Sequence, residues 1–275
     1  MKLICKYLKI RIPRNKYEDQ WKRYSNYSHK RKKTHKETKK RIRSLLYLLD
    51  KIIDQLQDLE QMHQSSLNLP DKYYSRIKIV RKVLKQQQEI FQSGKSVPDR
   101  IVSISKSYIR PIVRGKEVKS VEYGAKVNMI QFDGINFIEH LSFNAFNEGT
   151  RLIKSIRYGR SLFGQITHIS ADDIYATNKN RKYSTSAKIV TNFKRKGRAG
   201  KYEDQRQIIS RELRKERTIR MEGSFGTEKE HYGLQRIKAR TEKTEILWIF
   251  FGVHTANAVR ISKRLAVSRV KRQAA

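Results

Sequence analysis

The stretch VEYGAKVNMIQFDGINFIEHLSF, which spans residues 121–143, carries the clearest fold information in this chain of 275 residues. Residues 121–131 and 135–143 form two apolar runs rich in β-branched side chains, which is typical of buried strands. Asp133 and Gly134 lie between them, and an Asp-Gly pair at this place favours a two-residue hairpin turn. The stretch therefore predicts two antiparallel strands, with Asp133 as a turn residue.

The segments on either side of this hairpin predict the rest of an α/β fold. Residues 147–158 predict a crossover helix, and the short apolar run 165–170 predicts a buried strand. Residues 203–221 and 241–265 then predict two long helices, the second with an apolar centre that would pack on the sheet. Upstream of the hairpin, residues 101–105 alternate partly, as a strand would.

The first hundred residues are basic and have a helical pattern. Apolar residues between 42 and 59 recur at the i, i+3, i+4 and i+7 spacing of an amphipathic helix, and a second such helix follows Pro70. We therefore expect an antiparallel helical hairpin there. The polar Gly- and Pro-containing segment 93–98 marks a boundary, which predicts a helical region at 1–97 and an α/β core at 98–275.

Charge is the dominant feature of the composition. A formal net charge of +36 and a pI near 10.4 predict a polyanionic partner, because phosphates release counterions when Lys and Arg neutralise them. A solvated surface in a basic proteome is the alternative explanation. Two cationic runs are the candidate DNA contacts, although either could be a solvated surface segment. Their side chains include Lys30, Arg31, Lys32, Lys33, Lys194, Arg195, Lys196 and Arg198.

Several classes of protein are disfavoured by composition. Cys5 is the lone cysteine, which excludes an internal disulfide framework and a Cys-rich zinc site. The longest apolar stretch, 246–253, is far shorter than the roughly 20 residues that span a bilayer. The opening residues are too charged for a signal peptide. We therefore expect a soluble cytoplasmic protein, associated with the nucleoid and without a membrane partner.

Two carboxylates stand in contexts that suit phosphodiester chemistry. Asp172 follows the predicted strand 165–170, and a strand end is a rigid platform for a carboxylate. Glu222 and Lys229 are seven residues apart, about two helical turns, so they would share one helical face. Such a set offers carboxylate ligands for a divalent metal and a cation for a phosphate.

Four stretches of the chain resemble the DDE-type transposases of bacterial insertion sequences. They are residues 100–116, 121–127, 172–181 and 222–229, which lie within the span from Asp99 to Asn257. The resemblance implies an RNase H-like core whose Asp, Asp and Glu carboxylates bind two Mg²⁺ or Mn²⁺ ions for DNA strand cleavage and transfer. It assigns the second Asp to Asp172, the Glu to Glu222 and a phosphate contact to Lys229. Transposon ends, target DNA and further copies of the chain would be the partners.

The chain also departs from the family's pattern. No strand with a suitable Asp precedes Asp50, and the chain is expected to begin inside the helical insertion that follows the family's first Asp. Lys215 and Thr218 occupy the places of the family's Tyr and Arg, although Arg217 and Arg220 lie close by in the sequence. With one carboxylate missing, metal affinity should fall.

These observations predict an α/β fold with an incomplete RNase H-like core, a mixed sheet with flanking helices, preceded by the basic helical insertion. The expected function is that of a transposase by descent, as a truncated and inactive copy. The alternatives are a non-catalytic basic nucleic-acid-binding protein and a regulator of transposition that binds transposon ends or the intact enzyme.

Overall fold

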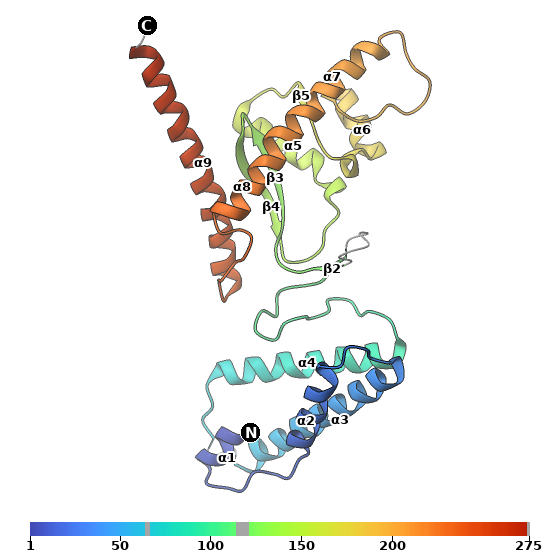
Figure 1. Cartoon of the computed structure of the whole chain (residues 1–275), viewed down its shortest axis with the longest axis vertical. Helices are drawn as coiled ribbons and strands as arrows, with labels where there is room; N and C mark the ends of the chain where they lie inside the picture. Colours follow the sequence, from blue (N-terminus) through green and yellow to red (C-terminus); the bar gives the residue numbers. More distant parts are fainter. Residues whose placement is uncertain (64–66, 114–120, 274–275) are drawn as a thin grey trace. The chain divides into compact units, whose positions relative to one another are not determined.

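A computed structural model describes residues 1–63, 67–113 and 121–273, with side chains described as far as Ser268 (Figure 1). The chain divides into two compact units, Met1–Ser107 and Tyr108–Ala275.

The first unit is helical. Its helices are α1 (Lys2–Tyr7), α2 (Tyr17–Ser28), α3 (His35–Met62) and α4 (Asp71–Ser93). Thr34 begins α3 as its N-cap, with a side chain that accepts a hydrogen bond from the Glu37 amide, and this is the capping that a Thr before a helix provides. Gly94 ends α4 in the left-handed conformation, at a φ of 68°.

The predicted helical hairpin of α3 and α4 is confirmed. Leucines and isoleucines from the apolar stripes of both helices are buried, as amphipathic helices require. Polar contacts also join the helices, since the Tyr73 hydroxyl donates to Glu60 at 2.7 Å and Arg81 donates to Gln57 at 3.3 Å. The strand suggested by the partial alternation at 101–105 is not present. The Ile101 amide instead donates a hydrogen bond to the Gln86 side chain of α4.

The described strands of the second unit form three separate two-stranded ladders. They are β1 (Ile112–Val113) with β2 (Val121–Glu122), β3 (Lys126–Phe132) with β4 (Ile135–Ser142), and β5 (His168–Ile169) with β6 (Val190–Thr191). The last pair is parallel and the other two are antiparallel. The α/β class is therefore correct, but within the described residues these ladders do not join into one mixed sheet.

The central hairpin matches its prediction closely. Phe132 pairs with Ile135, which leaves Asp133 and Gly134 as the turn, and both have positive φ values, 47° and 73°. That combination is the twist-matched type I′ turn that an Asp-Gly pair favours. The run predicted as one strand from residue 121 is interrupted at Gly124, whose φ of 122° is open to glycine but strained for other residues.

Helices pack around this hairpin (Figure 1). The segments that follow β4 are η1 (Glu148–Thr150), α5 (Leu152–Phe163), η2 (Asp173–Tyr175), α6 (Asn178–Ser186), α7 (Glu203–Glu216), η3 (Arg217–Glu222), α8 (Gly223–His231) and α9 (Glu242–Gln273). Helix α5 contacts both strands of the hairpin and α9 contacts β4. A buried cluster of Leu152, Ile156, Ile189 and Phe193 joins α5 to the segment around β6.

The predicted helix 203–221 corresponds to α7 and η3, which lead directly into α8. Residues 217–222 have π-helical hydrogen bonding, a local widening that often occurs near functional sites. In Figure 1, α7 and α8 lie along one continuous helical path. None of the described helices combines the length and the apolar composition that a membrane crossing would need.

Candidate nucleic-acid interface

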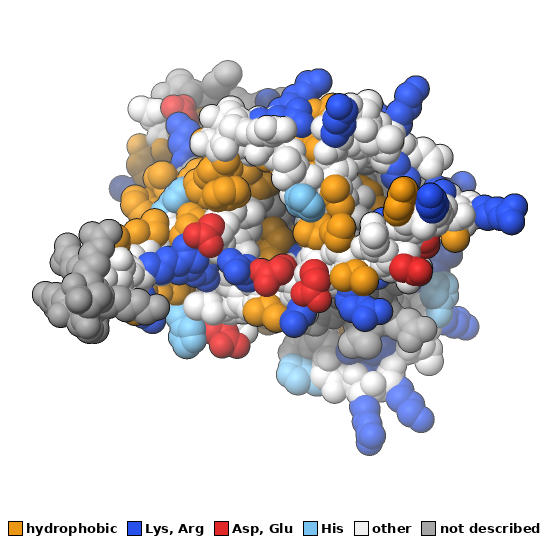
Figure 2. Space-filling view, turned by 90° about the horizontal axis from the view of Figure 1, so that it is seen from above, with side chains coloured by type: hydrophobic (Ala, Val, Ile, Leu, Met, Phe, Trp, Pro, Cys, Tyr) orange, Lys and Arg blue, Asp and Glu red, His pale blue; other side chains and the backbone are white. Residues whose placement is uncertain are grey.

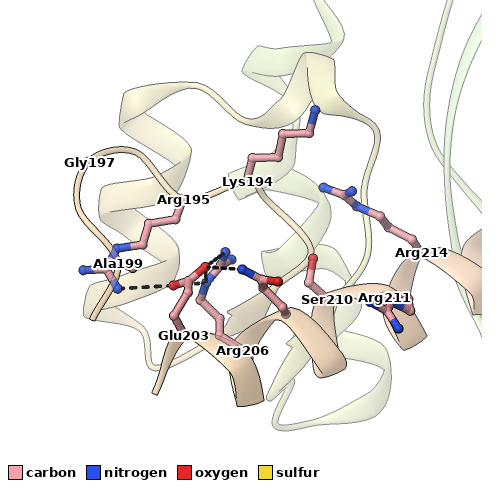
Figure 3. Close-up of a pocket in the computed structure, with 10 residues that line it drawn as sticks. Lys194, Arg195, Gly197, Ala199, Glu203, Arg206, Ser210, Arg211 and Arg214 are labelled. Atoms are coloured by element: carbon pink, nitrogen blue, oxygen red, sulfur yellow. Dashed lines mark hydrogen bonds and ion pairs between the residues drawn. The ribbon is translucent and has the colours of Figure 1, made fainter. Parts of the chain in front are cut away.

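A basic pocket of about 480 Å³ lies between α7 and the loop that follows β6 (Figure 3). Its walls come from both elements, and five of the lining side chains are Lys or Arg while one is acidic. The lining residues are Lys194, Arg195, Gly197, Ala199, Glu203, Arg206, Gln207, Ser210, Arg211 and Arg214. A concave surface with such a charge excess is suited to a phosphate backbone.

Glu203 organises one side of this pocket. It accepts hydrogen bonds from Arg206, with two Nε contacts at 3.0 and 3.1 Å, and it forms an ion pair with Arg195 at 3.5 Å. The hydrogen bond from Arg206 is the main cause that lowers the pKa of Glu203 to about 2. Glu203 therefore stays ionised at neutral pH and orients these two arginines, as the dashed contacts in Figure 3 show.

Other pocket side chains are fixed by backbone carbonyl groups. Arg206 also donates to the Phe193 carbonyl at 3.1 Å, and Arg214 donates to the Asn192 carbonyl at 3.0 Å. In contrast, the side chains of Lys194 and Arg211 are exposed and have no hydrogen-bond or ion-pair partner within the described part of the chain. These two cations are therefore available to a ligand.

The loop itself is tied to α6. Arg181 donates to the Lys194 carbonyl at 2.5 Å and lies over the Phe193 ring, 5.4 Å from its centroid. Lys196 donates to the Asn178 side chain at 2.7 Å, outside the pocket lining. Of the loop residues predicted to contact DNA, the pocket thus uses Lys194 and Arg195, while Lys196 and Arg198 are exposed beside it.

Asp172 is linked to this pocket through Asn192. The buried Asn192 side chain bonds both to the amide of Ala171, at 3.0 Å, and to its carbonyl, at 2.8 Å. The carbonyl of the same Asn192 accepts from Ser210 and Arg214 of α7. Asn192 therefore holds both α7, which lines the pocket, and Ala171, which immediately precedes Asp172.

The predicted acidic residues have separate partners. The exposed Asp172 carboxylate accepts from the Asp173 amide at 2.8 Å and caps η2. Glu222, at the end of η3, is exposed and forms an ion pair with Arg217 at 3.3 Å, and Lys229 is exposed on α8. The described interactions do not join Asp172 to Glu222, so their proximity stays a prediction. Within the described residues, His, Cys, Asp and Glu do not gather in any group of three or more that could hold a metal.

Sequence reasoning missed a buried polar network that holds α8. Asn136 of β4 is fully buried, and its Nδ2 donates to Ser224 at 2.9 Å and to the Glu228 carboxylate at 2.5 Å. Burial raises the pKa of Glu228, which is only 2% exposed. The Asn257 side chain of α9 accepts a hydrogen bond from the Asn136 amide at 3.0 Å and donates one to the Asn136 carbonyl at 2.7 Å. The available signal was the i, i+4 spacing of Ser224 and Glu228 on one helical face.

The cationic run of the first unit lies at the end of α2 and the start of α3. Lys30, Arg31, Lys32 and Lys33 are all exposed. Lys30 forms an ion pair with Glu37 at 2.6 Å, while the side chains of Arg31 and Lys32 have no such partner within the described chain. In the space-filling view of Figure 2, Lys and Arg side chains project into solvent at several places, between hydrophobic and acidic side chains.

Comparison with known proteins gives no relative: no family model, curated protein or solved structure matches the chain.

Proposed function

We propose that this chain is a DNA-binding protein of the transposase type, and that it holds the phosphate backbone of duplex DNA in the basic pocket between α7 and the loop after β6. The observation that carries the proposal is the pocket lining, in which five cations accompany one carboxylate. Lys194 and Arg211 have side chains without a partner in the described chain, so they can contact phosphates without breaking an existing bond.

The physical case rests on charge and geometry together. Arginine presents a planar fork of donors that matches phosphate oxygens, and Arg195 and Arg206 are already oriented by Glu203. A ligand therefore meets arginines that lose little side-chain freedom on binding. The net charge of +36 adds a long-range attraction for any polyanion, which the pocket alone would not provide.

The resemblance to DDE-type transposases extends this proposal to transposition, with transposon ends and target DNA as the ligands and an RNase H-like core in the second unit. The link through Asn192 favours it, because DNA held in the pocket would lie against the segment that carries Asp172. Helix α7 also continues through η3 to Glu222, eight residues beyond Arg214.

Mg²⁺ or Mn²⁺ would be held by Asp172 and Glu222 in this extended proposal. Asp172 is exposed and has a free oxygen atom to offer, since only Oδ1 caps η2. Glu222 fits less well as it stands, because its Oε1 is paired with Arg217 and this ion pair must open first. When bound, such ions would activate the attacking oxygen and stabilise the leaving one.

A charge-matched comparison tests the proposal. The variant Lys194→Gln/Arg211→Gln removes two pocket cations, whereas Lys243→Gln/Lys263→Gln removes two exposed cations from α9. Each lost phosphate contact should lower the salt slope of log affinity by about 0.9, which corresponds to about 8-fold in affinity at 0.1 M salt. We therefore expect about 60-fold weaker duplex binding for the pocket variant and little change for the α9 variant.

Fluorescence anisotropy of a labelled duplex, titrated at several salt concentrations, measures both quantities. Equal losses in the two variants would show that only net charge matters and that the pocket is not the binding site. Binding that does not respond to salt would remove the proposal altogether.

A further inference from the structure

Three aromatic side chains form an exposed row on α2. Tyr17, Trp21 and Tyr24 follow the i, i+4, i+7 spacing of one helical face, and they are 43%, 56% and 39% exposed. The Tyr17 and Trp21 rings are stacked, with centroids 6.3 Å apart and planes at 11°. Trp21 and Tyr24 follow at 6.0 Å with planes at 39°. The rings of this aromatic row therefore contact one another and are yet open to solvent.

The described polar contacts between α2 and α3 do not involve the row. Two other side chains make the described polar contacts with α3: the Tyr27 hydroxyl bonds to Thr38 at 2.7 Å, and Gln20 accepts from Arg41 at 3.2 Å. Isolated exposed aromatics are common on protein surfaces, but a stacked row is a contiguous apolar surface of the kind that binding sites use.

Cations border the aromatic row at its C-terminal end. Lys33 lies over the Tyr27 ring, with its Nζ 5.6 Å from the centroid, so the cationic run folds back along α2. Arg31 and Lys32 project from the same loop with exposed side chains. Over residues 1–43 the sequence holds 17 Lys and Arg side chains but 3 Asp and Glu, which makes this a strongly anion-attracting surface.

We propose that the aromatic row binds the bases of unpaired nucleic acid, while the cationic run at 30–33 follows its phosphates. Stacked aromatic side chains beside a basic track are the standard arrangement for binding single strands, because every base offers a π-face. A duplex hides those faces inside its own stack, so this site is distinct in ligand from the basic pocket of the second unit.

The charge pattern favours unpaired nucleic acid over a second copy of the chain or an acidic protein as the ligand of this surface. A second copy of the chain would bring the same excess of cations to the surface and would be repelled. An acidic protein could form ion pairs with the cations, but it would not supply planar bases to stack on the aromatic rings. Unpaired DNA and RNA supply both features, and the shared chemistry does not depend on which sugar is present.

Trp21 provides a direct readout. The chain has two tryptophans, so the variant Trp248→Phe leaves Trp21 as its one indole reporter. We expect oligothymidylate and oligouridylate to quench this fluorescence as bases stack on the ring, and a blunt duplex to quench it much less. Quenching by either single strand supports the site, and the two single strands together show whether DNA or RNA is preferred.

Affinity measurements with matched variants complete the test. In the full chain, Trp21→Ala should weaken binding of a labelled single strand by roughly 5- to 150-fold, the loss expected for one stacked base, and should leave duplex binding unchanged. Tyr47→Ala is the control, because Tyr47 is an aromatic residue of α3 that is 73% exposed. It lies nine residues, or about two and a half turns, after Thr38, which contacts α2, so it is on the opposite face of α3. Equal effects of the two variants, or an acidic protein as the better quencher, would overturn the proposal.

Discussion

Replacing Asn136 with alanine should destabilise the second unit in a pH-dependent way. The substitution removes three side-chain bonds: to Ser224, to Glu228 and, as an acceptor, from Gln131 at 2.8 Å. Ser224 keeps its bond to the Met221 carbonyl, and Gln131 keeps its bond to Ser224. The Glu228 carboxylate, however, is 2% exposed and would lose the hydrogen bond it accepts from Asn136.

The magnitude follows from that buried carboxylate. A hydrogen bond to a charged group contributes about 1.5–3 kcal/mol, and a buried group without a partner bears its full desolvation cost. We therefore expect Asn136→Ala to lower the free energy of unfolding by about 2–3 kcal/mol at pH 8. The double variant Asn136→Ala/Glu228→Gln should recover part of this loss, since the orphaned charge is gone.

The sign of the pH effect can be worked out from the pKa of Glu228. Burial raises this pKa above its usual 4.5, so the stability that protonation provides is fully present below about 4.5 and is lost as pH rises through the folded-state pKa. The hydrogen bond from Asn136 opposes that shift, so Asn136→Ala should raise the pKa further. The stability difference between the two proteins should therefore be small at pH 4.5 and should grow toward pH 8.

Urea unfolding at several pH values is the assay, with Trp248 fluorescence in a Trp21→Phe background as a probe of the second unit. Asn192→Ala is the matched control, because Asn192 is also buried and its side chain bonds to the backbone of Ala171, which does not titrate. A loss that is the same at every pH, as expected for Asn192→Ala, would refute the reasoning about Glu228.

Two further predictions concern DNA. Glu203→Gln removes the one negative charge of the pocket lining but keeps a side-chain oxygen that can accept from Arg206. Duplex binding should therefore tighten, by about 8-fold at 0.1 M salt if one more phosphate is neutralised, and weaker binding in an anisotropy titration would contradict this. Supercoiled DNA incubated with Mg²⁺ should stay uncut, because the resemblance supplies Asp172 and Glu222 but not the third carboxylate. Metal-dependent nicking that is lost in Asp172→Ala would show that another residue completes the site.

The hairpin and the helices could be predicted because their signals are local. The turn at Asp133 and Gly134 depends on the φ preferences of two adjacent residues, and the helices depend on spacings within a few turns. The pairing of β5 with β6 left no such signal, because two-residue strands are too short to show a period. Strand 121–131 was predicted as one element because Gly124 breaks the ladder without interrupting the apolar pattern.

The site was predicted only in part for a similar reason. Dense charge in the sequence identified Lys194 and Arg195, but the cations of α7 are spread among acidic residues and did not form a run. Arg206, Ser210 and Arg214 are four residues apart, which places them on one helical face, yet the sequence did not show which element that face meets. Nor could it reveal Asn192 as the contact between α7 and the segment before Asp172.

The two predicted carboxylates are held by different asparagines, and this determines how they can be brought together. Asp172 follows a segment fixed by Asn192, while α8, which begins directly after Glu222, is fixed by Asn136. Because α7 contacts Asn192 and continues through η3 into α8, it is the element that connects the two supports. The π-helical turn at Arg217–Glu222 lies within this connection, so a change in its hydrogen bonding would rotate Glu222 relative to the pocket. Under the proposed function, whether DNA held in the pocket reaches both carboxylates therefore depends on that turn.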